Sequence, residues 1–241
     1  MSDPRPSLIG RRLEDVEEII AVSSGKGGVG KSMVASSLAL HLAESGQRVG
    51  LLDLDFTSPS THVILGIDGL FPDEAYGIIP PVAHNIKYMS ITHFALDKPA
   101  PLRGTDISDA ILELLAITLW GDLDYLIIDM PPGLGDATLD VIRFVERIRF
   151  LVVTTPSKVA YETVRKQLTL LKKLRVSVIG VIENMERTPS DFVTLNVDVD
   201  RVLYLGAICY DEELEESLGD VARFKETTFY VEGSKLYSNI L

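Results

Sequence analysis

The stretch SSGKGGVGKS at residues 23–32 decides the fold of this chain, because it joins an apolar run to a helical segment through a glycine-rich loop. Gly25, Gly30, Lys31 and Ser32 complete the pattern G-x-x-x-x-G-K-[ST] of a phosphate-binding loop. In such loops, backbone N–H groups and the N-terminus of the following helix bind phosphate oxygens. We therefore expect Lys31 to contact the β- and γ-phosphates and Ser32 to coordinate Mg²⁺ directly.

The size and composition of the chain favour one large domain. It has 241 residues, of which 46% are hydrophobic, and its mean hydropathy is +0.20. Met1–Glu18 is charged and lacks the apolar core of a secretory signal. We expect an N-terminal extension over residues 1–18 and a single P-loop ATPase domain over 19–241. No apolar run approaches the roughly 18–20 residues that span a bilayer, so we expect a cytoplasmic protein without a membrane partner.

The charge of the chain argues against nucleic acid as a partner. Its formal net charge is −12 and its pI is about 4.8, so the average surface repels phosphate backbones. The densest basic segment, Arg165 to Arg175, has the spacing of a solvated helix face. The single cysteine, Cys209, excludes an internal disulfide.

Apolar runs alternate with segments of helical period along the chain. The runs are rich in Ile, Val and Leu and do not alternate with polar residues, which is typical of buried parallel strands. The expected strands are Ile19–Ser23, Arg48–Asp53, Ile86–Ile91, Tyr125–Met130, Phe150–Thr155, Val176–Glu183 and Val202–Ile208. The expected helices are Lys31–Glu44, Asp106–Ile117, Asp136–Glu146, Ala160–Leu174 and Asp211–Leu218. This order predicts an α/β fold, with a doubly wound, mostly parallel sheet of about seven to eight strands and helices on both faces.

Carboxylates follow the second expected strand, in LLDLDFTSPS at residues 51–60. Asp53 and Asp55 are two residues apart, so in a strand their side chains share one face. Ligands of such sheets bind at the carboxyl ends of the strands, where both carboxylates could face a nucleotide. We expect Asp53 to bind Mg²⁺ through water and Asp55 to orient the attacking water. The alternative is that they cap a turn.

Another carboxylate ends the fourth expected strand, in DYLIIDMPPGLGD at residues 124–136. An apolar strand that ends in Asp129 matches the Walker B arrangement, in which the carboxylate contacts Mg²⁺ through water. Pro131, Pro132 and Gly133 then predict a sharp turn that could respond to the γ-phosphate.

Several motifs together resemble the deviant Walker A ATPases of the Mrp, MinD and ParA group. KGGVGKS contains Lys26, a lysine that the simple phosphate-loop pattern does not require. Five motifs resemble the Mrp side in particular, in the order of that family. They are DLDFTSPS at 53–60, PLRG at 101–104, the Asp129 motif extended to 120–136, and the pair TTPSKVAYETVRK at 154–166 and VIGVIENM at 178–185.

The resemblance implies roles for individual residues. Lys26 would reach across a homodimer interface to the phosphates of the partner's nucleotide, and so act in catalysis with Lys31 and Asp55. Gly133 would be the hinge of the second switch, and Asn184 would contact adenine. The expected nucleotide-binding residues are Gly25, Lys26, Gly27, Gly28, Val29, Gly30, Lys31, Ser32, Met33, Gly133 and Asn184. No NKxD motif for guanine is present, which favours ATP and ADP.

The sequence also departs from the family pattern. Met33 stands where the family has Thr, and Ser58 replaces a glycine. Cluster carriers of the Mrp type have C-x-x-C shortly after ENM, whereas this chain reads ENMERTPSDFVTLN. A [4Fe–4S] cluster needs four thiolates, and two copies of Cys209 supply two. We therefore expect no iron–sulfur cluster of its own. The four scattered histidines likewise predict no transition-metal site.

These features leave several functions open. The favoured one is a Mg²⁺-dependent ATPase, slow without a partner, whose homodimer assembles a metal centre with a metallochaperone or maturation protein. Because the Mrp cysteines are missing, the chain resembles the atypical HypB ATPases of nickel hydrogenase maturation. The alternatives are a positioning ATPase of the MinD/ParA type, a nucleotide-gated scaffold, and an Mrp-type iron–sulfur cluster carrier without its own C-x-x-C. The tail EGSKLYSNIL predicts a docked helix rather than a membrane anchor.

Overall fold

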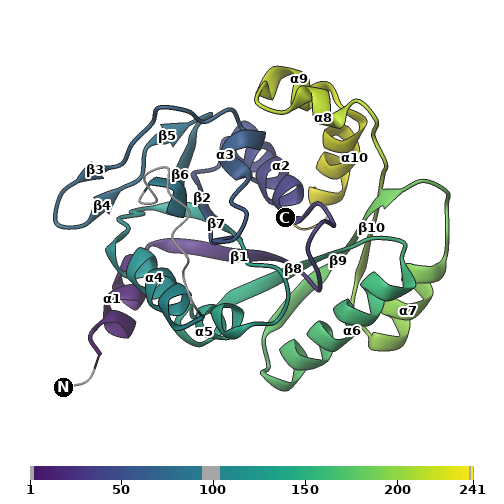
Figure 1. Ribbon diagram of the computed structural model, residues 1–241, viewed down its shortest axis with the longest axis horizontal. Helices are drawn as coiled ribbons and strands as arrows, with labels where there is room; N and C mark the ends of the chain where they lie inside the picture. Colours follow the sequence, from purple (N-terminus) through teal and green to yellow (C-terminus); the bar gives the residue numbers. More distant parts are fainter. Residues whose placement is uncertain (1–2, 94–103, 239, 241) are drawn as a thin grey trace.

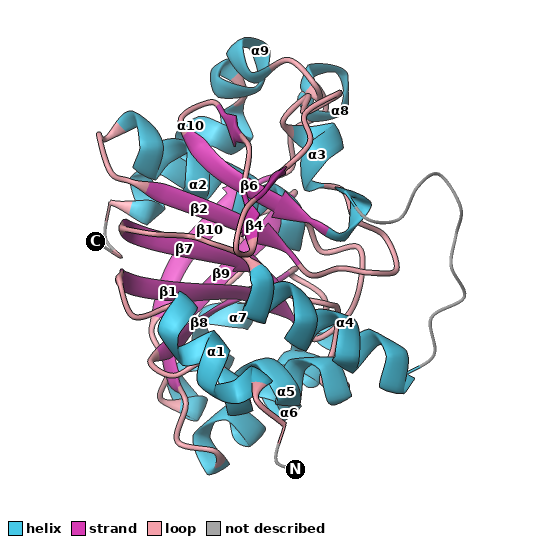
Figure 2. Ribbon diagram, turned by 90° about the vertical axis from the view of Figure 1, so that its left-hand side faces the viewer, coloured by secondary structure: helices cyan, strands magenta, loops and turns pink. Residues whose placement is uncertain are grey.

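A twisted eight-stranded sheet forms the centre of the computed structural model, which describes residues 3–93, 104–238 and 240 (Figure 1). Its strands are β1 (Val16–Ser24), β2 (Val49–Asp53), β5 (Val82–Ala83), β6 (Ile86–Ser90), β7 (Leu123–Asp129), β8 (Ile148–Thr154), β9 (Ser177–Glu186) and β10 (Tyr204–Cys209). They lie in the order β10-β9-β8-β1-β7-β2-β6-β5. Figure 2 shows the strands of the sheet side by side, in magenta. All pairs are parallel except β5 with β6. The short strands β3 (Asp73–Glu74) and β4 (Ile78–Ile79) form a separate antiparallel pair.

Helices cover both faces of the sheet, which confirms the predicted doubly wound architecture. They are α1 (Arg5–Arg12), α2 (Lys31–Glu44), α3 (Thr61–Ile64), the 3₁₀ helix η1 (Ile91–His93), α4 (Gly104–Ile117), α5 (Asp136–Phe144), α6 (Lys158–Lys173), α7 (Phe192–Asp200), α8 (Leu214–Ser217), α9 (Val221–Glu226) and α10 (Thr228–Tyr237). In Figure 1, α2 and α10 lie on one side of the sheet and α4 to α7 on the other. No helix of the described residues is long and apolar enough to cross a membrane.

Two hydrophobic cores explain why the strands read as continuous apolar runs. Along β7, Leu126 and Ile128 belong to the core under α4 to α7, whereas Ile127 between them belongs to the core under α2 and α10. Successive strand side chains point to opposite faces, so a strand covered on both sides needs apolar residues at every position. The lack of alternation in the sequence follows directly from this packing.

The N-terminal segment differs from the expected boundaries. β1 begins at Val16, three residues before the predicted start, and it is preceded by helix α1. α1 packs against α4, and its Ile9 is buried in the same core as the helices on that face. The division of the chain into an extension and one domain stays a prediction.

In the C-terminal part, the spacing of apolar residues does not predict where the helices begin and end. The helix predicted over Asp211–Leu218 is the single turn α8, and α7 and α9 were not predicted. The predicted tail helix lies in α10 as far as Tyr237, and α10 packs on α2 through a 2.6 Å hydrogen bond between the buried hydroxyls of Ser37 and Tyr237. The PLRG motif lies outside the described residues at positions 101–103.

The carboxyl ends of three central strands meet at one edge of the sheet. β1 and β2 flank β7, and Asp129 is paired in register with Val22 on one side and with Asp53 on the other. The loops that follow these strands therefore converge, as the Asp53, Asp129 and glycine-loop motifs predict.

Candidate functional site

The loop of residues 25–30 joins β1 to α2 in a conformation that glycine permits. Gly28 and Gly30 have φ angles of 77° and 83°, in the left-handed region that strains other residues. Gly30 is the N-cap of α2 and provides no side-chain hydrogen bond to the helix. The first backbone N–H groups of this 14-residue helix therefore receive no hydrogen bond from an N-cap side chain. Because these groups can donate to an anion instead, the loop fits a phosphate.

Two glycines of this loop touch side chains from distant elements. A Cβ atom on Gly25 would lie 2.4 Å from Oγ1 of Thr163 in α6, and one on Gly30 would lie 2.2 Å from Nδ2 of Asn184 in β9. Both distances are shorter than any van der Waals contact. Packing therefore requires glycine at both positions, and at Gly30 the backbone conformation requires it as well.

Asn184 supports the backbone of the phosphate-binding loop. Its side chain is 2% exposed, and Nδ2 donates a 2.9 Å hydrogen bond to the carbonyl oxygen of Val29. The amide thus holds the residue that precedes Gly30. The predicted contact of Asn184 with adenine stays a prediction, and Met33, also expected at the nucleotide, is half-buried against the core under α2.

Lys31 is buried and already paired within the chain. Its Nζ lies 2.5 Å from Oδ1 of Asp129 and 3.7 Å from Oδ2 of Asp55. It also donates to the hydroxyl oxygen of Ser32 at 3.3 Å. The loop lysine therefore joins two of the predicted carboxylates and the predicted Mg²⁺ ligand in one cluster.

Asp129 ends β7 in full burial and keeps one oxygen without a partner. Oδ1 bonds Lys31, whereas Oδ2 has no hydrogen-bond partner among the described residues. Burial raises the pKa of the Asp129 carboxyl to about 7, and the attraction of Lys31 opposes this rise. A buried carboxylate oxygen without a donor fits a site where metal-bound water supplies the missing hydrogen bond.

Asp53 organises the loop that follows β2. Oδ1 accepts a 2.9 Å hydrogen bond from the N–H of Asp55, and Oδ2 accepts from the N–H and hydroxyl of Thr61 at 3.2 and 2.6 Å. Burial raises the pKa of this carboxyl, while the bonds from Thr61 lower it. Both oxygens are thus used by the protein, and the predicted contact of Asp53 with Mg²⁺ through water stays a prediction.

Asp55 has a different environment from Asp53 although the two residues are close in sequence. β2 ends at Asp53, so the two-residue period of a strand does not continue to Asp55. Oδ1 of Asp55 accepts from the hydroxyl of Thr57 at 2.7 Å and from the N–H groups of Thr57 and Ser58, each at 3.2 Å. Its second oxygen faces Lys31. Of the two aspartates, Asp55 is the one whose carboxylate lies beside the loop lysine.

Lys26 lies at the exposed end of the loop, followed by the exposed Gly27 and Gly28. Its carbonyl oxygen accepts a 2.9 Å hydrogen bond from the hydroxyl of Ser24. Within the described part of the chain, its ammonium group forms no ion pair. The additional lysine is therefore available to a group outside its own chain.

Gly133 connects the loop after β7 to the phosphate-binding loop. It has a φ of 82°, and its N–H donates a 3.0 Å hydrogen bond to the carbonyl oxygen of Ser24. The loop after β7 is thus attached to the residue that immediately precedes Gly25. A displacement of either loop would be transmitted to the other, which is compatible with the predicted hinge.

Taken together, the predicted residues form one site that fits a nucleotide with Mg²⁺. The loop presents an anion-binding helix N-terminus, and the Ser32 hydroxyl lies in the same cluster as the unpartnered oxygen of Asp129. No group of three or more His, Cys, Asp or Glu side chains in the described ranges is arranged to hold a metal. A cation here would need phosphate oxygens and water as further ligands. The individual roles of these residues stay predictions.

Residues of α6 also belong to the surroundings of the site, and they were not predicted. Gln167 is fully buried, and its Nε2 donates a 2.9 Å hydrogen bond to the hydroxyl of Ser23, just before the loop. Thr163, one turn earlier, is the side chain that excludes a Cβ from Gly25. The motif TTPSKVAYETVRK was the signal that could have indicated them, since it includes Thr163 and ends at Lys166, immediately before Gln167.

Cys209 lies at the end of β10, outside this cluster. It is exposed rather than packed, and its N–H donates a 2.7 Å hydrogen bond to Oε2 of Glu232. Partial burial and the charge of Glu232 raise the pKa of the thiol. The thiolate is the form that binds iron, and these surroundings favour the neutral thiol when no metal is bound.

Comparisons with known proteins agree with the sequence motifs and with the fold. The family model described as ParA, NUBPL iron-transfer P-loop NTPase, matches residues 15–197. An iron-sulfur cluster carrier protein of Pseudomonas fragi is 45% identical over 72% of this chain and 62% of its own length. Another, from Aquifex aeolicus, is 40% identical over 75% of this chain and 51% of its own length. The chain thus spans between half and two thirds of the length of these relatives.

Solved structures show the same architecture. A nucleotide-binding protein from Archaeoglobus fulgidus in complex with ADP has a TM-score of 0.77 and 32% identity, covering 92% of this chain and 93% of its own. The septum site-determining protein MinD of Pyrococcus horikoshii, complexed with Mg-ADP, has a TM-score of 0.70 and 23% identity over 93% of this chain and 96% of its own. The second likeness concerns the fold alone.

The comparisons correct the favoured function. Nickel hydrogenase maturation is wrong as the main interpretation, because the similar curated proteins are named iron-sulfur cluster carriers. The resemblance to HypB, which rested on the missing C-x-x-C, is not confirmed. A missing motif does not indicate which metal a partner of the chain binds.

Proposed function

Since this chain belongs to the family of iron-transfer P-loop NTPases, we propose that it is a Mg²⁺-dependent ATPase that acts in the transfer of iron–sulfur clusters. The family match over residues 15–197 carries this proposal, because it covers the phosphate-binding loop and every other predicted site residue. The identity of 40–45% to two cluster carriers supports the iron–sulfur part. The proposal concerns a chain that matches only part of those relatives' length.

The phosphate-binding loop would hold the nucleotide. Lys31 would exchange Asp129 for phosphate oxygens, and Asp129 would then accept hydrogen bonds from water around the cation. The hydroxyl of Ser32 would bind Mg²⁺ directly. When bound, Mg²⁺ neutralises charge on the phosphates and helps to orient them. The absence of an NKxD motif favours ATP over GTP as the substrate.

Asp55 is the residue that we assign to orient the attacking water. Its carboxylate lies beside Lys31 and is held in place by Thr57 and Ser58. In hydrolysis, the water oxygen bonds to the γ-phosphorus, and the bond from this phosphorus to the bridging oxygen breaks. The products are ADP and phosphate, and the proton of the water leaves to phosphate or solvent. A positioned carboxylate accelerates such a step by accepting a hydrogen bond from the water.

The iron–sulfur cluster would be cargo rather than a resident cofactor. A [4Fe–4S] cluster is held by four thiolates, and this sequence contains one cysteine. A homodimer would supply two copies of Cys209, whose thiol has a raised pKa. We therefore propose that a partner protein holds part or all of the cluster while this chain binds and hydrolyses nucleotide.

The homodimer itself is supported by the contrast between the two loop lysines. Lys26 is exposed without an ion pair among the described residues, although it precedes a loop built for phosphates. A second cation supplied in trans would neutralise charge that develops on the phosphoryl group. We propose that Lys26 reaches the nucleotide of the partner copy in this way.

One experiment tests both parts of this function. The full chain is mixed anaerobically with a [4Fe–4S]-loaded scaffold protein and an apo-ferredoxin acceptor, and cluster transfer is followed by visible circular dichroism. Phosphate release is measured in the same mixture. We expect Mg-ATP to be hydrolysed and to accelerate transfer at least about threefold over the mixture without nucleotide, since the nucleotide state would change the affinity for the cluster-bearing partner.

The control is Lys31→Ala, which should remove both the phosphate release and the ATP-dependent acceleration. Hydrolysis without any effect on transfer would contradict the iron–sulfur role and leave the ATPase assignment intact. Transfer without hydrolysis would contradict the ATPase assignment. The two parts of the proposal can therefore fail separately.

A further inference from the structure

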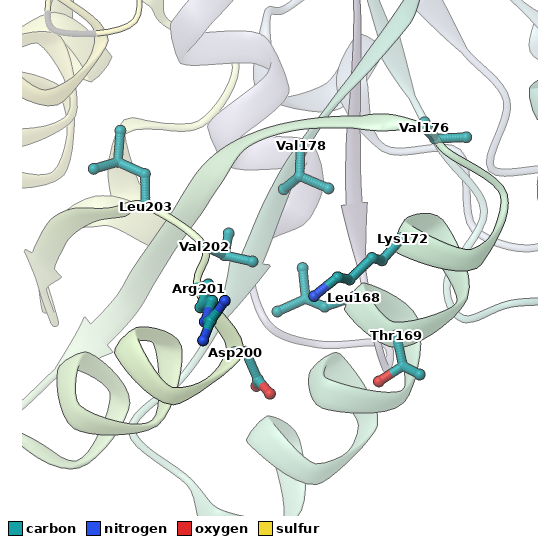
Figure 3. Close-up of a pocket in the computed structure, with 9 residues that line it drawn as sticks. All are labelled: Leu168, Thr169, Lys172, Val176, Val178, Asp200, Arg201, Val202 and Leu203. Atoms are coloured by element: carbon teal, nitrogen blue, oxygen red, sulfur yellow. The ribbon is translucent and has the colours of Figure 1, made fainter.

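A cavity lies between α6 and the end of α7, away from the phosphate-binding loop. Its volume is about 510 Å³, and Figure 3 shows the side chains that line it. They come from the C-terminal half of α6, from Val176 and Val178 around the start of β9, from the last residue of α7, and from residues 201–203, which connect α7 to β10. We name this space the α6–α7 cavity. Its size is within the range of small-molecule sites, about 300–1,000 Å³.

The topology explains why this space is not filled. β9 begins at Ser177, but its pairing with β10 begins only at Val181, opposite Tyr204. The first residues of β9 therefore lack a strand beside them on that side. The chain that leaves α7 passes over this gap through Leu203, whose carbonyl oxygen accepts a 2.8 Å hydrogen bond from the N–H of Val181.

Apolar side chains form one part of the lining of the cavity, and Thr169, Lys172, Asp200 and Arg201 form the other. Leu168 is buried beneath it, and Val176, Val178 and Val202 are half-buried around it. Leu203 is 60% exposed at the rim. An apolar body placed here would remove these side chains from water, which is the main source of affinity for small ligands in such sites.

Two cations stand at the opening. In Figure 3 the side chain of Lys172 extends from α6 over Leu168 toward Arg201, which comes from the opposite wall. Neither forms an ion pair with any residue that the structure describes. The chain has a net charge of −12, so two cations without an ion pair at one place differ in sign from its average surface.

The acid next to Arg201 in the sequence, Asp200, is hydrogen-bonded to a residue of α6. Asp200 also lines the cavity, but its Oδ2 accepts a 2.8 Å hydrogen bond from the hydroxyl of Tyr161. Figure 3 shows its carboxylate pointing away from Arg201 and Lys172. The tyrosine hydroxyl is neutral, so the Asp200 carboxylate keeps its negative charge, but that charge is directed toward α6 and away from the two cations.

We propose that the α6–α7 cavity binds a small organic acid, with an apolar body on the valine and leucine walls and a carboxylate between Lys172 and Arg201. Guanidinium and ammonium groups both form charge-assisted hydrogen bonds with carboxylate. The apolar walls select against small inorganic anions, because those anions would leave the walls in contact with water. This site is separate from the nucleotide site and does not depend on the proposed ATPase function.

Sodium octanoate is the probe for this proposal. Titration of the ¹⁵N-labelled full chain, followed by amide NMR shifts, should show saturation with a dissociation constant of about 1 mM or lower. The shifts should be largest at residues 168–178 and 200–203. Octanol, which lacks the charge, and acetate and inorganic phosphate, which lack the apolar chain, should each bind at least about tenfold more weakly.

Variants assign the binding to the cavity. Lys172→Gln and Arg201→Gln should each weaken octanoate binding about tenfold, since each removes one charge-assisted contact. Lys173→Gln is the matched control, because it changes the charge of the next residue on α6 outside the cavity lining. Thr169→Trp fills the opening from an exposed position and should abolish binding.

Each alternative result overturns the proposal. Octanoate that does not saturate, octanol that binds as tightly as octanoate, or phosphate that binds as tightly as octanoate would each contradict it. Unchanged affinity in both glutamine variants would also do so. Thermal melting of each variant checks its fold, and the three surface substitutions are independent of one another, so a single unfolded variant leaves the others to decide.

Discussion

The two ends of the phosphate-binding loop differ although only a few residues separate them. At one end, the side chain of Lys31 is 6% exposed and its Nζ lies between Asp129 and Asp55. At the other end, Lys26 is exposed and has no ion pair among the described residues. The same residue type is therefore buried and neutralised at one end and unpaired in solvent at the other.

This difference supports the proposal that the loop serves two nucleotides, one in each copy of a homodimer. A buried lysine loses its hydration, so it needs an anionic partner close by. That partner is a carboxylate of its own chain or a phosphate of a nucleotide bound to that chain. An exposed lysine keeps its hydration and can be brought to a phosphate of another copy at little cost. Lys31 is thus suited to its own nucleotide and Lys26 to that of a partner. The following variants test this contrast, beginning with the largest expected effect.

Lys31→Ala should have the largest effect of these substitutions. It removes the cation that would contact the phosphates and leaves Asp129 buried without a partner. We expect ADP to bind about 100-fold more weakly, since charge-assisted hydrogen bonds contribute roughly 3 kcal/mol. Hydrolysis of ATP should fall at least about 1,000-fold in kcat/KM, because binding and transition-state stabilisation are both lost. Calorimetric titration with ADP that gives the wild-type affinity would place Lys31 outside the nucleotide site.

Asp55→Ala should affect turnover and spare binding. Its carboxylate would orient the water, so kcat should fall about 1,000-fold, the middle of the range for a group that acts on a transferred proton. Affinity for ADP should stay within about fivefold, since ADP contains no γ-phosphate for the water to attack. Phosphate release and ADP titration measure the two quantities. Asp68→Ala, an exposed acid on the same segment, is the control and should leave both unchanged.

Lys26→Ala should abolish the dependence of dimerisation on nucleotide. In wild type, two exposed lysines would repel across the interface until bound phosphates reverse the sign of the interaction. The variant should keep nucleotide affinity within about tenfold. Its kcat should fall about 100-fold, which is the effect of removing one hydrogen-bond donor that stabilises the transition state. Sedimentation of both proteins without nucleotide, with ADP and with a non-hydrolysable ATP analogue gives the comparison.

Lys173→Ala is the control for Lys26→Ala, because it removes an exposed lysine far from the loop. It should dimerise like wild type in all three conditions. If Lys26→Ala also behaves like wild type throughout, the additional lysine is a solvated surface residue and the contrast between the loop ends has no function.

Asn184→Ala should have the smallest effect of this series. It removes the hydrogen bond to Val29 that holds the loop, so ADP should bind roughly tenfold more weakly, equivalent to about 1.4 kcal/mol. Pyrophosphate, which has no base, distinguishes two roles. A loop support weakens ADP and pyrophosphate alike, whereas a contact with adenine weakens only ADP. Asn196→Ala, which removes an amide bonded to a backbone carbonyl in α7, should change neither.

Most elements of the fold could be predicted, and the failures have a physical pattern. The helix predicted as Lys31–Glu44 has those bounds in the structure, because the glycine loop starts it and Gly46 follows its end. The predicted central strands agree within a few residues, since burial on both faces demands apolar runs. By contrast, α7 contains apolar and polar residues without a clear stripe, and no local pattern predicted it. Helices such as α9 are short and depend on tertiary contacts for their stability.

The candidate site was predictable as a set of residues and less so as a set of contacts. Gly25 and Gly30, Lys31 and Asp129 converge as the motifs indicate. The expectation that Asp53 and Asp55 share one face assumed that the strand continued, whereas it ends at Asp53. Local pattern therefore indicated which residues gather, and the exact end of one strand decided which carboxylate lies beside the lysine.

By itself, the sequence determined the phosphate-binding loop, the alternation of strands and helices, and the edge of the sheet where the site lies. These depend on residues close together in the chain, and glycine positions and apolar runs record them directly. Only the tertiary structure decided that Lys31 is paired with a carboxylate 98 positions away, and that Asn184 supports a backbone carbonyl 155 positions away. The sequence contains no local signal for such pairings, because they arise from the order in which strands pack side by side.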